Sequence, residues 1–129
     1  MPALDDVARI ACALPEVTEG SRYGRRAWMV AGTAFAWERP FSTADIRRFG
    51  DEVPPQGPIL GVRVADLSVK DAVLDSGRRG IFTIPHFDGY AAVLVRLRVV
   101  GTRVLRDLVE EGWLACAPRA LVEDVQRRG

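Results

Sequence analysis

Residues 27–38 read Ala-Trp-Met-Val-Ala-Gly-Thr-Ala-Phe-Ala-Trp-Glu, two apolar runs separated by Ala31-Gly32. Residues 27–30 and 33–38 predict two short strands, because both runs are rich in apolar, aromatic or β-branched residues. Two-residue connections that contain glycine close antiparallel hairpins, since glycine readily adopts the positive φ that such turns require. This stretch therefore predicts a sheet that is built on an antiparallel hairpin.

Helices and further strands surround this hairpin. The hydrophobic pattern predicts helices over residues 4–14, 43–49, 66–76 and 102–117, a shorter helix after Pro118, and strands over 59–64, 81–84 and 90–100. Ser42, Asp66 and Thr102 are the predicted helix caps. Hairpin connections outnumber the long crossovers that parallel pairing needs. We therefore expect an α+β domain with a mainly antiparallel sheet and helices packed on one face.

Composition predicts one globular domain over residues 1–129, with 48% hydrophobic and 27% charged residues. A net charge of +1 gives no whole-molecule attraction to nucleic acid. Cys12 and Cys116, each between alanines, are expected to be buried small hydrophobic residues. No secretory signal or membrane span is predicted, so we expect a cytoplasmic protein without a membrane partner.

Period-two alternation separates two faces of the predicted strands. In residues 59–64, Arg63 lies on the face opposite Leu60, and in residues 90–100 Arg96 and Arg98 share a face. If the helices cover the apolar face, these arginines project from an open face. Arginines there suit phosphate contacts, but a solvated face on which arginine stems cover apolar surface has the same pattern.

The border of this face is expected to be aromatic and charged. Its predicted members are Arg25, Arg26, Glu38, Tyr23, Tyr90 and either Trp28 or Trp37. Aromatic rings beside arginines suit base stacking or the binding of an anionic small molecule. The border could therefore form the rim of a pocket.

Residues 83–90, Thr-Ile-Pro-His-Phe-Asp-Gly-Tyr, form a polar and aromatic turn with the only histidine. Asp88 could orient His86 as an acid–base residue, or His86 could hydrogen-bond the turn or stack on Phe87. The sequence has no metal-ligand spacing, glycine-rich phosphate loop or nucleophile elbow. We therefore expect no catalytic residue, metal or cofactor, and interpret His86 and Asp88 as part of a binding rim.

Several segments together resemble the MmcQ/YjbR family. They are Leu14-Pro15-Glu16-Val17-Thr18-Glu19-Gly20, Tyr23-Gly24, residues 27–30 and 32–36, and the blocks 80–87, 90–97 and 105–115. The resemblance covers residues 4–120 and implies a frataxin-like (CyaY-like) fold and DNA binding. Iron binding is not carried over, because Arg9 lies beside Asp5 and Asp6 in the first helix. Thr33 replaces a lysine that the family often has after the hairpin glycine, which removes one phosphate contact.

Three functions remain open. The leading prediction is a non-enzymatic protein that binds double-stranded DNA through Arg25, Arg26, Arg63, Arg96 and Arg98. The second is a domain that binds a small anionic molecule in a pocket between Tyr23, the His86 turn and the sheet arginines. The third is an interaction module with an exposed aromatic patch of Phe41 and Trp28 or Trp37. The sequence assigns no oligomeric state.

Overall fold

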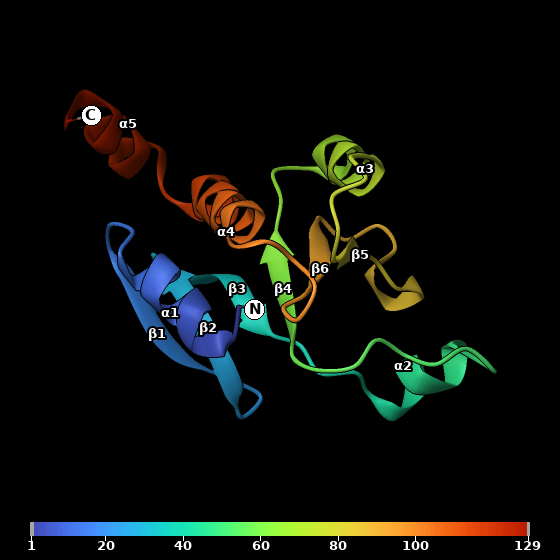
Figure 1. Cartoon of the computed structure of the whole chain (residues 1–129). Helices are drawn as coiled ribbons and strands as arrows, with labels where there is room; N and C mark the ends of the chain where they lie inside the picture. Colours follow the sequence, from blue (N-terminus) through green and yellow to red (C-terminus); the bar gives the residue numbers. More distant parts are fainter. Residues whose placement is uncertain (1, 129) are drawn as a thin grey trace.

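The computed structural model describes residues 2–128 and contains a six-stranded antiparallel sheet of order β1-β2-β3-β4-β6-β5 (Figure 1). The strands are β1 (Val17–Arg22), β2 (Arg25–Val30), β3 (Thr33–Glu38), β4 (Ile59–Arg63), β5 (Ile81–Phe82) and β6 (Ala92–Arg96). The helices are α1 (Leu4–Cys12), α2 (Thr43–Arg48), α3 (Leu67–Asp75), α4 (Thr102–Cys116) and α5 (Arg119–Arg128), and Pro85–Phe87 forms a 3-10 turn. The predicted α+β class is confirmed.

The connections follow the predicted turn and cap chemistry in most places. The β2–β3 turn at Ala31-Gly32 has φ values of 50° and 78°, as a two-residue hairpin turn requires. Asp66 caps α3 by accepting a 2.8 Å hydrogen bond from the Val69 N–H. The prediction for Thr102 is wrong: Gly101 is the N-cap of α4, and Thr102 is already its first residue.

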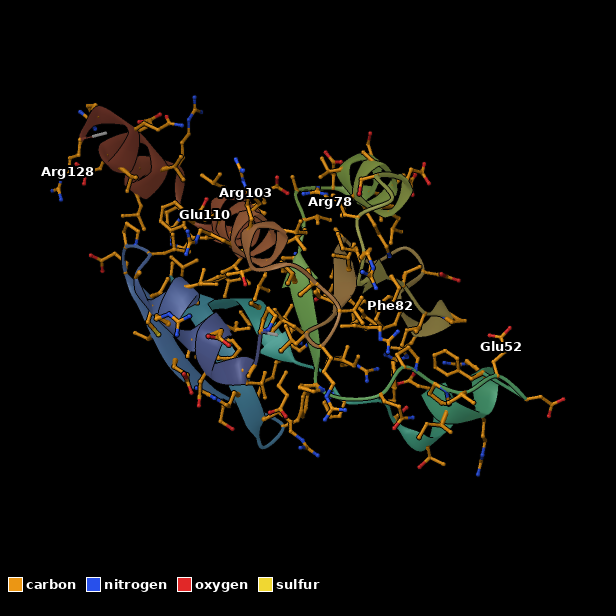
Figure 2. All side chains as sticks on the ribbon, viewed as in Figure 1. Glu52, Arg78, Phe82, Arg103, Glu110 and Arg128 are labelled. Atoms are coloured by element: carbon orange, nitrogen blue, oxygen red, sulfur yellow. The ribbon has the colours of Figure 1, made fainter. Side chains whose placement is uncertain are left out.

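The larger core lies between the sheet and α1, α3, α4 and α5, with α4 packed on β3 and β4. Leu105, Leu108 and Trp113 on α4 are almost fully buried. A Cβ at Gly112 would lie 3.0 Å from Val62 Cγ1, so this glycine lets α4 approach the sheet closely. Arg103 and Glu110 are on the exposed side of the same helix (Figure 2).

The opposite face of the sheet is covered rather than open. Its buried residues are Ala27, Trp37, Ile59, Ile84, Phe87, Ala92 and Leu94, and the rings of Phe41, Phe49, Phe82 and Tyr90 pack against them. The segment around α2 supplies two of these rings, and α2 lies apart from α3, α4 and α5 (Figure 1). Apolar residues on both faces of β4 and β6 demand two cores, so the expectation of an open arginine face was wrong.

β6 and β3 each depart from the predicted alternation. β6 ends at Arg96, because the chain turns back there and the Val99 and Val100 N–H groups donate to the Arg96 carbonyl. Arg98 therefore lies in a turn and not on the predicted long strand. In β3, an irregular register places both Phe35 and Ala36 in the larger core, which breaks the strict alternation.

The two cysteines are free and lie nearer the surface than expected. Cys12 is exposed, because the buried side of α1 consists of Val7, Ile10 and Ala11. Cys116 is half-buried, and desolvation raises the pKa of its thiol. Within residues 2–128, no helix combines the length and apolarity that crossing a membrane requires.

Candidate anion-binding cleft

A cleft of about 720 Å³ lies on the aromatic face of the sheet. It is lined by Arg22, Tyr23, Arg25, Trp37, Glu38, Arg39, Pro40, Phe41, Ser42, His86, Phe87 and Tyr90. These residues come from the β1–β2 hairpin, the end of β3 with the segment that follows it, and the His86 turn. The volume falls within the range of small-molecule sites, roughly 300–1,000 Å³.

Trp37 forms the aromatic floor of the cleft. Its indole lies over Gly61 of the neighbouring strand, and its ring centroid is 6.5 Å from that of Phe87 and 6.4 Å from that of Tyr90. Phe87 and Tyr90 in turn meet edge to face, with centroids 5.5 Å apart. The floor is thus a packed set of rings, whose rotamers are fixed by one another and by the sheet.

Arg22 and Arg25 stand at the hairpin side of the cleft. They are register partners across the two-residue turn at Tyr23-Gly24, and their side chains both line the cleft. Arg25 is 54% exposed, and its nearest carboxylate oxygen, Glu38 Oε2, is 3.8 Å away, beyond hydrogen-bond distance. Most of the hydrogen-bonding capacity of Arg25 is therefore directed toward solvent and the cleft.

Arg39 supplies a third cation, but it is held in place by Asp45. The Arg39 Nη1–Asp45 Oδ2 distance is 3.0 Å, and the guanidinium lies 5.5 Å from the centroid of the Phe87 ring. Burial alone would raise the pKa of Asp45, but hydrogen bonds from the Ser42 N–H and from Arg39 outweigh it and lower the pKa. Arg39 is thus a fixed, partly neutralised charge, unlike Arg25.

Tyr23 occupies the tip of the hairpin and is 92% exposed. Its φ is 52°, and that of Gly24 is 75°, so the two residues form the kind of turn in which Asn-Gly is favoured. A tyrosine in this left-handed region carries some backbone strain. The prediction that Tyr23 borders a pocket is consistent with its place in the cleft lining.

The His86 turn forms the opposite wall. His86 is exposed, lines the cleft, and has its ring 6.1 Å from that of Phe87. Asp88 is exposed and lies outside the lining, so the predicted binding rim includes His86 but not Asp88. Within residues 2–128, no three His, Cys, Asp or Glu side chains lie together in a way that could hold a metal ion.

Lys70, on α3, fastens this turn to the helical layer. The residue is 5% exposed, and its Nζ donates to the Phe87 carbonyl at 2.5 Å and to the Tyr90 carbonyl at 2.8 Å. Because these carbonyls belong to two cleft residues, Lys70 sets the position of the wall without lining the cleft.

Arg26 and Trp28 lie on the other face of the sheet, contrary to expectation. Alternation along β2 places both toward α1, where Trp28 is fully buried. Arg26 Nε and Nη2 donate to Glu19 at 2.9 and 3.1 Å, and Nη1 donates to Asp5 at 2.9 Å. These bonds raise the pKa of Arg26, and the bond from Arg26 lowers the pKa of Glu19. Arg26 therefore ties the sheet to α1.

The three remaining predicted arginines do not converge on the cleft. Arg63 Nη1 donates to the Tyr90 hydroxyl at 3.2 Å, so Arg63 supports the floor from outside the lining. The Nε atoms of Arg63 and Arg96 are buried without a hydrogen-bond partner in the described chain, residues 2–128. The exposed Arg98 packs its stem against Gly57. Hence these arginines form no continuous stripe with Arg25.

Three important residues of the site were missed from the sequence. A hairpin turn at Tyr23-Gly24 would have predicted that Arg22 lies beside Arg25. The strand before this turn was not recognised, because most residues of β1 are polar. Arg39 comes directly after β3 and before Pro40, a proline that indicates the chain turns at this end of the sheet. Lys70 gave one signal, as the only lysine in the chain, but its partners lie 17 and 20 residues away.

The sequence is similar to proteins from mycobacteria. The uncharacterized protein Rv2570 of Mycobacterium tuberculosis is 45% identical over 126 residues, and the match covers 95% of each chain. The uncharacterized protein Mb2600 of Mycobacterium bovis gives the same identity and coverage. The chain belongs to the family of these mycobacterial proteins. The match spans nearly the whole of both chains, so the similarity extends over the domain as a whole.

No family model matches the chain. No solved structure matches it.

Proposed function

We propose that this protein is a non-enzymatic binding protein whose cleft holds a small anionic ligand. One observation carries the proposal: Arg25 directs a guanidinium into a cleft with a fixed aromatic floor, while its nearest carboxylate stays beyond hydrogen-bond distance. A planar guanidinium with free donors suits a phosphate or carboxylate, which it can bind with two parallel hydrogen bonds.

The other residues of the cleft have supporting roles in this proposal. Arg22 adds a second exposed cation at the hairpin, and Arg39 adds a fixed positive charge beside Phe87. His86 on the opposite wall can donate a hydrogen bond to an anion that reaches across the cleft. The floor rings of Trp37, Phe87 and Tyr90 pack on one another, so the floor needs little ordering on binding.

Calorimetric titration with inorganic phosphate and pyrophosphate tests this function. We expect pyrophosphate to bind more tightly than phosphate, because it can contact more than one arginine, and its affinity to fall as salt is added. Arg25→Ala should abolish the heat of binding, whereas Arg47→Ala, an exposed arginine outside the cleft, should leave it unchanged. Failure of both anions to bind at low salt would contradict the proposal.

DNA binding, which the family resemblance implies, is a second candidate. The observation that favours it is the hairpin tip, where the exposed Tyr23 lies between Arg22 and Arg25 and could contact a base and two phosphates. Arg26 forms ion pairs with Glu19 and Asp5, so the proposed contact with DNA is limited to the hairpin tip. An anisotropy titration with labelled duplex DNA at low salt tests it. Undetectable binding, or an affinity that does not fall as salt rises, would dismiss this function.

We also propose membership in the MmcQ/YjbR family, with a frataxin-like fold and a cytoplasmic location. The order of one helix, a three-stranded hairpin series, and later strands followed by α4 supports this assignment. Free thiols at Cys12 and Cys116 suit a reducing compartment. Superposition of an experimental structure on a frataxin tests the fold, and fractionation of the native cells tests the location.

The third function, an interaction module with an exposed tryptophan patch, has no support, because Trp28 and Trp37 are both buried.

A further inference from the structure

The guanidinium of Arg22 lies over the rings of two aromatic residues that line the cleft. Its central carbon is 5.7 Å from the centroid of the Tyr23 ring and 5.4 Å from that of the Trp37 ring. A guanidinium is a flat, delocalised group that stacks on rings as a flat heteroaromatic ring does. Arg22 thus marks a place in the cleft where a planar group contacts both Tyr23 and Trp37.

The two aromatic residues at this place differ in exposure. Trp37 is 6% exposed and rests on the backbone of β4, so it is a fixed surface. Tyr23 is 92% exposed on a hairpin tip, and solvent surrounds most of its ring. A ring that is exposed in this way can move over a ligand that lies on Trp37.

The backbone at Tyr23 gives an independent reason to regard this ring as functional. Tyr23 has a φ of 52° in a turn position that favours asparagine or glycine. A large aromatic residue at such a position is strained and is not required by packing, since the side chain is almost wholly exposed. Strain that packing does not require is typical of binding and catalytic positions.

We propose that the ligand of this cleft carries a flat heteroaromatic ring in addition to its anionic group, as a nucleoside monophosphate does. This inference rests on the proposed anion-binding function and extends it. The ring takes the place of the Arg22 guanidinium and stacks on Trp37, with Tyr23 closing over its outer side. Arg22 then moves from the rings to the anion, which Arg25 also contacts. The cleft volume of about 720 Å³ has room for both parts of such a ligand.

Calorimetric titrations with AMP, adenosine and inorganic phosphate separate the two parts of the site. We expect AMP to bind roughly tenfold or more tightly than phosphate or adenosine, because stacking adds to the anion contact. Tyr23→Ala should reduce the affinity for AMP severalfold, because the ring of AMP then stacks on Trp37 alone. Tyr23→Phe keeps the ring and should bind AMP as the unaltered protein does. As a second readout, AMP should quench the tryptophan fluorescence of the unaltered protein but not that of Trp37→Phe.

The contrary outcomes distinguish this inference from the function on which it rests. Equal affinities for AMP and phosphate, or a Tyr23→Ala variant with unchanged AMP affinity, would overturn the ring site and leave anion binding intact. Equal affinities for AMP and adenosine would overturn the anion contact instead. If none of the three binds, both proposals fail. A single-stranded oligodeoxythymidine that binds more tightly than any mononucleotide would assign the ring site to nucleic acid and overturn a free small-molecule ligand.

Discussion

Trp37 and Gly61 are cross-strand neighbours, and the indole of Trp37 fills the space that a side chain at residue 61 would need. A Cβ at residue 61 would lie 2.6 Å from Trp37 Cε2, closer than non-bonded carbon atoms approach each other. Because Gly61 has no side chain, the indole of Trp37 can lie flat on β4 and form the cleft floor.

Gly61→Ala should displace the indole, and we expect it to lower the free energy of unfolding by roughly 1–3 kcal/mol, the usual cost of overpacking. Urea titration followed by tryptophan fluorescence measures both effects. Gly20→Ala is the matched control: its Cβ would meet the flexible end of Met29, which can move aside, so little change is expected. Equal stability of the two variants would contradict this account of the floor.

Arg25 and Arg26 are adjacent in β2, and their side chains lie on opposite faces of the sheet. Arg25→Ala should abolish pyrophosphate binding and change stability by less than about 0.5 kcal/mol, because the side chain is half exposed and only loosely paired. Arg26→Ala should bind pyrophosphate normally and lose roughly 1 kcal/mol of stability, since Glu19 and Asp5 lose their partner. Calorimetry and urea titration on both variants check this, and a shared phenotype would disprove the division.

Tyr23 and Ala31 each occupy the first position of a two-residue hairpin turn, with φ values of 52° and 50°. Asparagine is favoured there, so Tyr23→Asn and Ala31→Asn should each stabilise the protein by roughly 0.5–1 kcal/mol. Only Tyr23→Asn should weaken AMP binding, because Ala31 is outside the cleft lining. Thermal unfolding and calorimetry test the pair. A loss of stability in Tyr23→Asn would show that the turn is not strained.

Lys70 connects α3 to the wall of the cleft through two carbonyl groups. Lys70→Met keeps most of the side-chain volume but removes the ammonium group that donates both hydrogen bonds, so we expect a loss of roughly 1–3 kcal/mol of stability. The affinity for pyrophosphate should fall as well, because the turn with His86 is no longer held. Asp71→Asn, at an exposed position next to it on α3, is the control and should behave like the original protein. Unchanged exchange of the amide protons in residues 86–90 of Lys70→Met would contradict this role.

Asp45 makes acid stability depend on its pairing with Arg39. Its pKa in the folded protein is below the ordinary value of 3.8, so its contribution is complete above about pH 5 and is lost as the pH falls through 3.8 toward the folded pKa. Asp45→Asn should be less stable by roughly 2 kcal/mol at neutral pH, and this difference should shrink below about pH 4. Urea titrations at several pH values check the trend. A difference that stays constant into strong acid would disprove it.

Much of the fold was predictable because its signals are local. The hairpin at Ala31-Gly32, the Ser42 and Asp66 caps and the buried side of α4 each depend on residues within a few positions of one another. β1 was not predicted as a regular strand, since it is an edge strand with mostly polar residues. β6 was predicted too long, because its apolar alternation continues to Val99 while the chain already turns after Arg96.

The sequence by itself determined the α+β class, the antiparallel hairpin at Ala31-Gly32 and the assignment of Tyr23, Arg25, His86 and Tyr90 to one region. Short-range periodicity and turn chemistry suffice for these features. Only the tertiary structure decided which charges remain available. Arg26 and Arg25 differ by one position and therefore face opposite sides, and Arg39 is matched by Asp45 across a loop. Whether an arginine is paired depends on long-range packing, and that packing placed the exposed Arg25 in a cleft whose floor rests on Gly61.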